Sequence, residues 1–377
     1  MLTVKGDSSA LSVYNITVTF ENDNRHGYEC LRIKNISYEL KYKFKYTVVV
    51  MMSKESRINI WDNLKFLMIV LVVIGHFADE FTLRSNTCRA LFLFIYSFHM
   101  QMLLFICGFF YNREKTKNNI LFYISAGYTI KIFFVIVKII IGVEPEFSLF
   151  ADAGIPWFMF VLAIYYAVMF GLKDVNRKYV MISSIILACF AGYDRSVGDF
   201  LYISRSVVFF PFFFAGVIAK DIDVIEIKKK YRKYGIIGSA AIVLIWGGLC
   251  LFKTDQMYFL RFLFTGRNPF FDDVRPIGPL CRLLSYAISA AMCVSLIFLI
   301  PDRKLPAITS MGRNTLNVYF WHYYVMLLLI RFADIKSLYV NVPGKILYFA
   351  IAFFAAIIIS TKPFGFPLKN VKNYIDK

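Results

Sequence analysis

Long apolar runs dominate the chain from residue 64 to residue 360 and decide what it can fold into. The runs follow one another closely, and the short segments between them hold most of the charged residues. Most of the runs match the roughly 17–25 residues of a helix that crosses a bilayer. Their approximate limits are 64–81, 90–111, 120–142, 156–172, 179–193, 201–219, 234–252, 280–300, 315–332 and 345–360. The sequence therefore predicts an all-α integral membrane protein with about ten transmembrane helices, and it excludes a soluble enzyme.

Basic residues gather in every second segment between the apolar runs. One set of segments holds 19 Lys and Arg, whereas the alternate set holds 8; the basic set is 112–119, 173–178, 220–233, 301–314 and the tail after residue 360. Basic residues near the ends of spans favour the cytoplasmic side of the membrane. We therefore expect both termini in the cytoplasm, and most of the formal net charge of +18 then reflects topology. Because the basic residues form no continuous stripe, we expect no nucleic-acid partner.

Residues 1–51 differ in character from the rest of the chain. They precede Met51-Met52 and the segment SKESRINIWDNLKF, which is typical of the beginning of a membrane protein. We therefore predict two parts, an N-terminal appendage at 1–51 and a polytopic membrane domain at 52–377. The appendage is either a small cytoplasmic segment or an upstream extension of the reading frame.

Three histidines lie inside the predicted spans, where ionisable side chains are costly and often functional. His76 lies in the outer half of the first span and His99 near the middle of the second, so we expect the two to face one cavity. His322 lies in the ninth span. Histidine titrates near neutral pH and suits general acid–base catalysis. The three lie on separate spans without the local spacing of zinc ligands, so no metal site is predicted.

Lys65 precedes His76 by eleven residues, which is close to three helical turns, so the two side chains share a helix face. They lie roughly 16 Å apart along the helix axis. This spacing suits a long anionic substrate that enters from the cytoplasm and places its reactive end near His76. The alternative is a lysine that extends to the interface and a histidine that hydrogen-bonds between helices. The spacing alone does not distinguish between these two interpretations.

Other polar or aromatic side chains lie at or within the spans. Arg113 and Arg313 stand where ordinary cytoplasmic anchors are expected. Lys131 lies within an apolar run and Arg205 opens one on the outer side, and the orientation of the chain in the membrane does not explain these two charges. Trp157 begins the fourth span, at a position where interfacial aromatic residues are common.

Five segments of the chain, in order across residues 57–325, resemble the motifs of acyltransferase family 3 and, within it, of the fucose 4-O-acetylase-like branch. They are RINIWDNLKFLMIVLVVIGH (57–76), FIYSFHMQMLLFICGFFY (94–111), PWF (156–158), RSVVFFPFFFAGVIAK (205–220) and GRNTLNVYFWHYYV (312–325). The family also has ten spans. The chain departs from its motifs at Gln101, Cys107 and Thr315, where Pro, Ser and Ser are usual.

The resemblance implies a catalytic role for His76, with Lys65 at the place where many members carry arginine. His99, Arg113, Arg205 and His322 match recurrent polar positions. The implied enzyme is an O-acetyltransferase of the bacterial cytoplasmic (inner) membrane. It moves an acetyl group from cytoplasmic acetyl-CoA to a hydroxyl of a sugar in a cell-surface polysaccharide or its precursor. Acetyl-CoA is a co-substrate, and no tightly bound cofactor is expected.

Roles follow for the candidate residues under this interpretation. Lys65, with Arg113 or Arg313, contacts the phosphates of acetyl-CoA. His76 either deprotonates the acceptor hydroxyl or carries a transient acyl group. His99, counted with His76 and Lys65 as catalytic, positions the glycan together with Arg205 and Trp157. The substrate-binding and donor-binding set is Arg113, Lys131, Trp157, Arg205, Arg313 and His322.

The alternative function is a proton-coupled transporter or flippase of a glycan intermediate, because histidines inside a membrane also serve proton relays. Transport predicts dependence on a proton gradient and no cleavage of a thioester. Acyl transfer predicts release of the CoA thiol in detergent, without any gradient.

Overall fold

The computed structural model describes the backbone of residues 17–23, 28–34, 38–151, 154–195, 198–267 and 269–376. The chain divides into two compact units, Met1–Ile58 and Asn59–Lys377. The strands β1 (Thr17–Asp23) and β2 (Tyr28–Lys34) of the first unit pair antiparallel, and α2 (Tyr38–Asp79) begins there. Side chains are described from Asn59 onward. The predicted appendage at 1–51 lies outside the residues with described side chains and stays a prediction.

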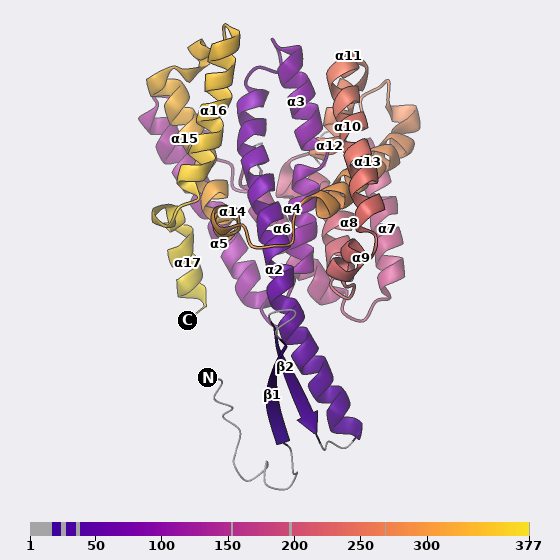
Figure 1. Cartoon of the computed structure of the whole chain (residues 1–377). Coiled ribbons are helices and arrows are strands. Elements are labelled where there is room, and N and C mark those ends of the chain that lie inside the picture. Colours follow the sequence, from indigo (N-terminus) through magenta and orange to yellow (C-terminus); the bar gives the residue numbers. More distant parts are fainter. Residues whose placement is uncertain are drawn as a thin grey trace. The chain divides into compact units, whose positions relative to one another are not determined.

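The second unit is built from helices and connecting loops, and its described residues contain no strand (Figure 1). After α2, the longer helices are α3 (Asn86–Tyr96), α4 (His99–Phe109), α5 (Thr116–Ile140), α6 (Trp157–Gly171), α7 (Arg177–Phe190), α8 (Ile203–Ala219), α10 (Arg232–Phe252), α13 (Gly278–Leu299), α15 (Thr315–Ala333) and α16 (Val342–Ile359). Short helices are α9 (Val224–Lys230), α11 (Thr254–Met257), α12 (Arg261–Thr265), α14 (Pro306–Gly312) and α17 (Leu368–Ile375). Single turns of 3₁₀ helix are η1 (Ala191–Tyr193), η2 (Phe200–Tyr202), η3 (Tyr258–Leu260), η4 (Arg275–Ile277), η5 (Ile335–Leu338) and η6 (Lys362–Gly365).

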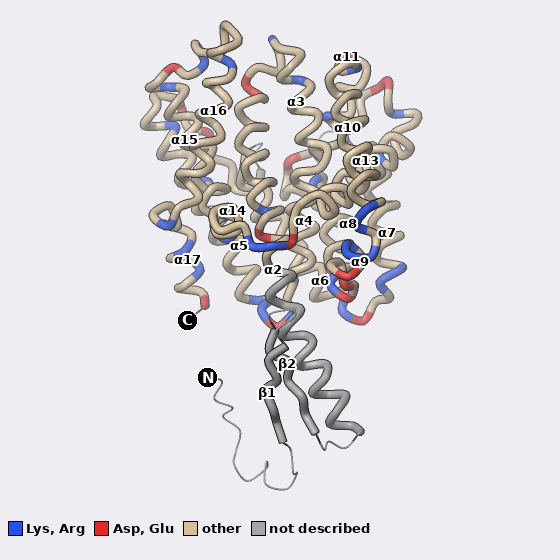
Figure 2. Tube along the Cα trace, in the orientation of Figure 1, with Lys and Arg blue, Asp and Glu red and all other residues tan. Residues whose placement is uncertain are grey.

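Seven helical segments in the described part of the chain are long and apolar enough to cross a membrane: Asn59–Asp79, Asn86–Phe109, Thr116–Ile140, Phe200–Ala219, Arg232–Phe252, Arg275–Leu299 and Val342–Ile359. The other three predicted spans are also helical. However, α6 and α7 have only 15 and 14 residues, and α15 has 19 residues that include polar side chains such as Asn317 and His322. An all-helical, multi-pass membrane domain is therefore confirmed, whereas the count of about ten and the cytoplasmic termini stay predictions. In Figure 2 the charged residues of this unit gather toward the helix ends and in the loops.

Two glycines let α4 and α8 approach closely. A Cβ atom at Gly108 would lie 1.8 Å from the carbonyl oxygen of Phe213, and one at Gly216 would lie 2.0 Å from that of Phe105. Small residues commonly allow such backbone contact between membrane helices. Both glycines belong to the family-like segments, so part of that sequence pattern is a packing requirement.

The second predicted span is broken between α3 and α4, at Ser97 and Phe98. A helix that is interrupted within the membrane leaves backbone carbonyl groups without their helical hydrogen-bond partners, so these groups must bond to other residues. The hydroxyl of Ser289 on α13 donates to the Ser97 carbonyl at 2.6 Å, and the indole of Trp246 on α10 donates to the Ser97 hydroxyl at 2.9 Å. The break is therefore held by two neighbouring helices, and it makes His99 the first residue of α4.

Candidate active site

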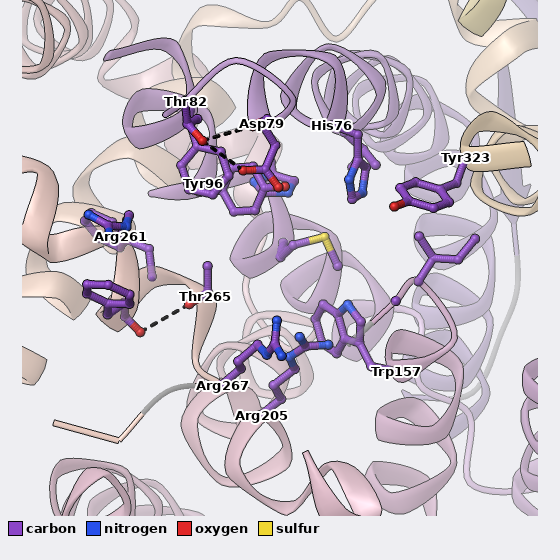
Figure 3. A pocket seen from close by; sticks show the side chains of 18 of the residues that line it. His76, Asp79, Thr82, Tyr96, Trp157, Arg205, Arg261, Thr265, Arg267 and Tyr323 are labelled. Atoms are coloured by element: carbon purple, nitrogen blue, oxygen red, sulfur yellow. Dashed lines mark hydrogen bonds between the residues drawn. The ribbon is translucent and has the colours of Figure 1, made fainter. Parts of the chain in front are cut away.

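A cavity of about 620 Å³ lies among the helices near the end of α2 (Figure 3). It is lined by the last turns of α2, by α3 and α4, by the beginnings of α6 and α8, by segment 258–267, and by α15. Small-molecule sites commonly occupy about 300–1,000 Å³. The structure places His76 and His99 in this one cavity, as their span positions predict, and adds His322 to the lining. The chemical roles of the three histidines stay predictions.

His76 and His322 form a pair of imidazole rings across the helices α2 and α15. Their ring centroids lie 5.2 Å apart, and the ring of Tyr323 approaches His76 edge-on at 5.4 Å. His76 is half-buried, whereas His322 is 2% exposed. The sequence separates these two histidines by 246 residues, so only the folded chain brings them together.

The tautomer of His322 follows from its hydrogen bonds. Nδ1 lies 2.8 Å from the carbonyl oxygens of Val318 and Tyr319. A carbonyl can only accept, so Nδ1 carries the hydrogen and Nε2 of the neutral ring is a base. Nε2 is buried and has no hydrogen-bond partner among the described residues. His322 therefore offers an unused proton acceptor beside His76.

His99 is oriented in the same way at the break between α3 and α4. Its Nδ1 lies 2.8 Å from the carbonyl oxygen of Ile95, one turn earlier in the chain. The ring of Tyr96 packs edge-on against it, with centroids 4.7 Å apart. His99 is 3% exposed, so it is firmly held in the wall of the cavity.

A second side of the cavity is formed by Trp157 and two arginines. The guanidinium of Arg205 lies 4.6 Å from the centroid of the Trp157 ring, and Phe209 stacks on that ring at 5.6 Å. Arg205 and Arg267 share the carboxylate of Asp199, at 3.8 and 2.8 Å. Trp157 and Arg205 thus line the cavity together with Arg267, and their role in substrate binding stays a prediction.

Arg261 approaches the cavity from the short helix α12. Its guanidinium lies over the rings of Tyr258 and Phe262, at 4.1 and 4.0 Å from their centroids. Burial lowers the pKa of Arg261 and raises the pKa of Tyr258, so the guanidinium is partly desolvated and the phenol stays protonated. Arg261 remains charged at neutral pH because an arginine pKa starts far above it.

Acidic residues line the cavity at the end of α2. Asp79 is exposed, and its carboxylate lies 3.5 Å from the hydroxyl of Thr82. Glu80 lines the cavity as well, and it pairs with Lys336. The lining therefore holds acidic groups at the end of α2 and basic groups on α3 (Arg89), on α8 and on segment 258–267.

Lys65 does not line the cavity but belongs to an ion cluster at the other end of the α2 span. Its ammonium lies 2.6 Å from one oxygen of Asp62, and Nε of Arg313 lies 3.2 Å from the other oxygen. Asp62 is buried, and a Cβ atom at Gly312 would lie 1.9 Å from its carbonyl oxygen. The structure thus brings two of the predicted donor-binding residues together, at a distance from the histidines.

Two further candidates lie outside the cavity. Lys131 is buried and donates to the carbonyl oxygens of Ser148 and Leu149 at 2.7 and 3.1 Å, so it ties segment 148–149 to α5. Arg113 is exposed. Neither residue is among those that line the cavity.

Sequence reasoning missed Asp79, Arg261 and Arg267 as site residues. The available signal was that segment 253–279 carries four of the eight basic residues in the basic-poor segments. The number of basic residues in this segment indicates only on which side of the membrane it lies. Which of these side chains face the cavity is set by the fold. No group of three or more His, Cys, Asp or Glu among the described residues is arranged to hold a metal ion, and the predicted lack of a metal stays a prediction.

A model of one protein family, described as an acyltransferase domain, matches residues 58–361. The match spans the membrane unit from the beginning of the α2 span to the end of α16, and it includes every residue described above for the cavity. No curated protein and no solved structure matches the chain.

Proposed function

The chain belongs to acyltransferase family 3, and from this premise we propose that it is an O-acetyltransferase of the bacterial inner membrane. It would transfer an acetyl group from cytoplasmic acetyl-CoA to a hydroxyl of a sugar in a cell-surface polysaccharide or its precursor. The observation that carries this proposal is the pair of His76 and His322, 5.2 Å apart at the cavity wall, with a free basic nitrogen on the second ring.

The proposed chemistry needs a base at the acceptor hydroxyl. His76 takes the hydroxyl proton as the hydroxyl oxygen attacks the thioester carbon of acetyl-CoA. The bond between carbon and sulfur then breaks, and the departing thiolate takes up the proton from His76. His322 lies beside His76 with Nε2 able to accept a hydrogen bond or a proton, which supports a role in holding the reactive ring. A transient acetyl group on His76 is the second route.

The donor would be held at the other end of the α2 span. Lys65 and Arg313 share one carboxylate, so the pair keeps a net positive charge, and both side chains are partly exposed. We assign them, with Arg113, to the phosphates of acetyl-CoA. The cavity reaches along α2 only as far as Val72, and Met68, Ile69 and Val70, which lie between Val72 and Lys65, are buried. The acetyl group must therefore pass this part of α2 to reach His76.

The first test uses the purified full chain in detergent with radiolabelled acetyl-CoA and a mixture of surface glycans. Release of the CoA thiol together with labelled glycan, with no membrane gradient, is the expected result. His76→Ala should lower the transfer rate by about 10²–10⁴-fold, the contribution typical of a general base. Expression and elution as a folded protein must match those of the wild type.

Two outcomes would contradict the proposal. Full transfer by the His76→Ala variant would remove that residue from the chemistry. Movement of a glycan across vesicles that depends on a proton gradient, with no cleavage of acetyl-CoA, would instead support the transporter. Mass spectrometry of surface glycans with and without the gene then identifies the acetylated sugar.

A further inference from the structure

The turn between α9 and α10 carries a dense group of basic residues. Segment 228–233 has the sequence KKKYRK, and Figure 2 shows Lys and Arg gathered around α9. Four of these side chains are exposed, and we call them the basic turn: Lys229, Lys230, Arg232 and Lys233. None of the four lines the cavity, and the proposed acetyl transfer does not use them.

Buried contacts of α9 hold the basic turn at the surface. The carboxylate of Asp223 caps the beginning of α9 and accepts from the backbone N–H groups of Ile225 and Glu226, each at 3.1 Å. Ile225 is buried, and the ammonium of Lys228 is buried as it donates to the carbonyl oxygen of Ile300 at the end of α13. Helix α9 is therefore fixed through one side, and the basic side chains that follow Lys228 face outward.

The charges of the basic turn are not paired within the protein. None of its four side chains takes part in an ion pair or a side-chain hydrogen bond with another described residue. The ammonium of Lys230 lies 5.3 Å from the centroid of the neutral Tyr231 ring. The basic turn therefore presents positive charge to whatever surrounds the protein at this point.

The neighbouring acidic residues do not neutralise this charge. In segments 220–233 and 301–304 they are Asp221, Asp223, Glu226 and Asp302. Asp221 forms an ion pair with the beginning of α7, Asp223 caps α9, and Asp302 interacts with Lys228. Glu226 is then the remaining carboxylate of these two segments, against four exposed cations.

The helix that follows the basic turn faces outward along most of its length. Only 17% of the α10 span is buried, the lowest share among the seven long apolar segments of the described chain. Its side chains Ile237, Leu244 and Leu251 are 61%, 74% and 61% exposed. At the beginning of the span Tyr234 is exposed, as is common for tyrosine at the boundary between membrane and water. In a bilayer this face of α10 contacts lipid chains, and the basic turn lies at the level of the headgroups.

We propose that the basic turn binds the headgroups of anionic phospholipids, whose acyl chains lie along the exposed face of α10. Lys and Arg next to a membrane helix attract anionic lipids, and each residue near the surface adds to the attraction. A phospholipid matches both parts of this surface, because it joins a negative charge to apolar chains. CoA carries phosphates without such chains, and a second copy of the protein would bring the same positive charge against this turn.

Native mass spectrometry of the purified full chain in detergent tests the proposal. The chain is titrated with dioleoyl phosphatidylglycerol or with dioleoyl phosphatidylcholine, which have the same acyl chains and differ in net charge. The wild type should bind phosphatidylglycerol about tenfold or more tightly than phosphatidylcholine. The triple variant Lys229→Gln, Lys230→Gln, Lys233→Gln should lose most of this preference. Replacement of the same three lysines by arginine should preserve it, because the charges are kept.

A matched control removes three other lysines from segments predicted on the same side of the membrane. Lys115, Lys117 and Lys178 are exposed, and none of them belongs to the cavity lining. The triple variant Lys115→Gln, Lys117→Gln, Lys178→Gln lowers the net charge by the same amount and should keep the preference for phosphatidylglycerol. The thermal unfolding midpoints of all variants should match that of the wild type, because every replaced side chain is exposed.

Four results would overturn the proposal. Equal binding of the two lipids by the wild type would remove the preference, and an equal loss in both glutamine variants would reduce it to net charge. Displacement of phosphatidylglycerol by CoA would assign the basic turn to the acyl donor. A dimer without bound lipid would assign the exposed face of α10 to a second copy. Since lipid binding is measured without substrate, its outcome is independent of whether the protein transfers acetyl groups.

Discussion

Two polar clusters lie at different ends of the α2 span, and they differ in how fully their polar groups are used. Around Asp62, both carboxylate oxygens are paired, one with Lys65 and the other with Arg313. The neighbouring Asn63 accepts from the hydroxyl of Thr309 at 2.7 Å and donates to two backbone carbonyls. These contacts join α2 to the segment before α15, so this cluster holds the fold together.

The cluster around His76 leaves polar groups available. His76 faces a cavity, and Nε2 of His322 has no hydrogen-bond partner among the described residues. Burying a polar group without a partner costs free energy, so such a group persists where a ligand or a reaction uses it. The two clusters therefore differ in what they offer a ligand: the Asp62 carboxylate is paired within the protein, whereas the histidine cluster presents an unpaired nitrogen at a cavity.

The largest effect is expected from removing the unused base, Nε2 of His322. His322→Ala should lower kcat about tenfold to a hundredfold, as loss of a residue that orients a reactive group commonly does. The KM for acetyl-CoA should not change, because the ion cluster around Asp62 stays intact. Steady-state kinetics over a range of pH provides the measurement.

His322→Gln is the informative companion, since glutamine keeps a hydrogen-bonding side chain but no titratable nitrogen. If it restores kcat, His322 acts by hydrogen bonding to the reactive ring; if kcat stays as low as in His322→Ala, His322 acts by moving a proton. An unchanged kcat in His322→Ala would show that the free nitrogen has no part in the reaction.

A substitution at Asp62 should lower the stability of the protein rather than the rate of the chemical step. Asp62→Ala leaves the ammonium of Lys65 and the guanidinium of Arg313 without their shared carboxylate, and it should cost about 1–3 kcal/mol, because Arg313 is largely exposed and can turn to water. The thermal unfolding midpoint in detergent should fall, while the KM for the acceptor sugar stays near that of the wild type. If Asp62→Ala lost binding of the acceptor sugar but kept the unfolding midpoint of the wild type, this cluster would take part in the reaction instead.

The sequence predicted the helical membrane domain well, because the length and apolar character of each run are local properties of the segment that forms the helix. It also predicted that His76 and His99 share a cavity, since consecutive spans joined by a short loop pack together. It did not predict that Asp62 pairs with Arg313 as well as with Lys65, because Asp62 and Arg313 lie 251 positions apart in the chain. The break at Ser97 and Phe98 carries no proline or glycine, so no local signal marks it.

Arg261 and Arg267, which line the cavity, were missed for a related reason. Arg261 and Arg267 lie in an irregular segment whose course depends on contacts such as that of Ser204 with Gly266. Arg205 was singled out because it is the one charged residue at the beginning of an apolar span. In a loop, the same charge has a ready explanation as an interfacial anchor, and only the folded chain shows which side chains turn inward.

A substitution at Lys65 should have a smaller effect, confined to the binding of acetyl-CoA. Lys65→Ala leaves Asp62 paired with Arg313, so the unfolding midpoint should change little. If Lys65 holds the phosphates of acetyl-CoA, its loss should raise the KM for that donor by about tenfold, equivalent to about 1.4 kcal/mol, with kcat preserved. Isothermal titration with CoA checks the effect on binding, and a KM that stays constant would reduce Lys65 to a structural partner of Asp62.

Arg113 should show the smallest effect of the predicted donor-binding residues. Its side chain is exposed, and the interaction of an exposed charge with a phosphate is screened by water and salt, so its contribution is about 0–1 kcal/mol. Arg113→Gln should therefore raise the KM for acetyl-CoA only a few-fold at low salt, and the difference from the wild type should vanish as the salt concentration rises. Lys65→Ala should keep most of its effect at high salt, because Lys65 is held against a buried carboxylate at a less exposed position. Equal salt sensitivity of the two variants would mean that Lys65, too, acts only through the general positive charge of that surface.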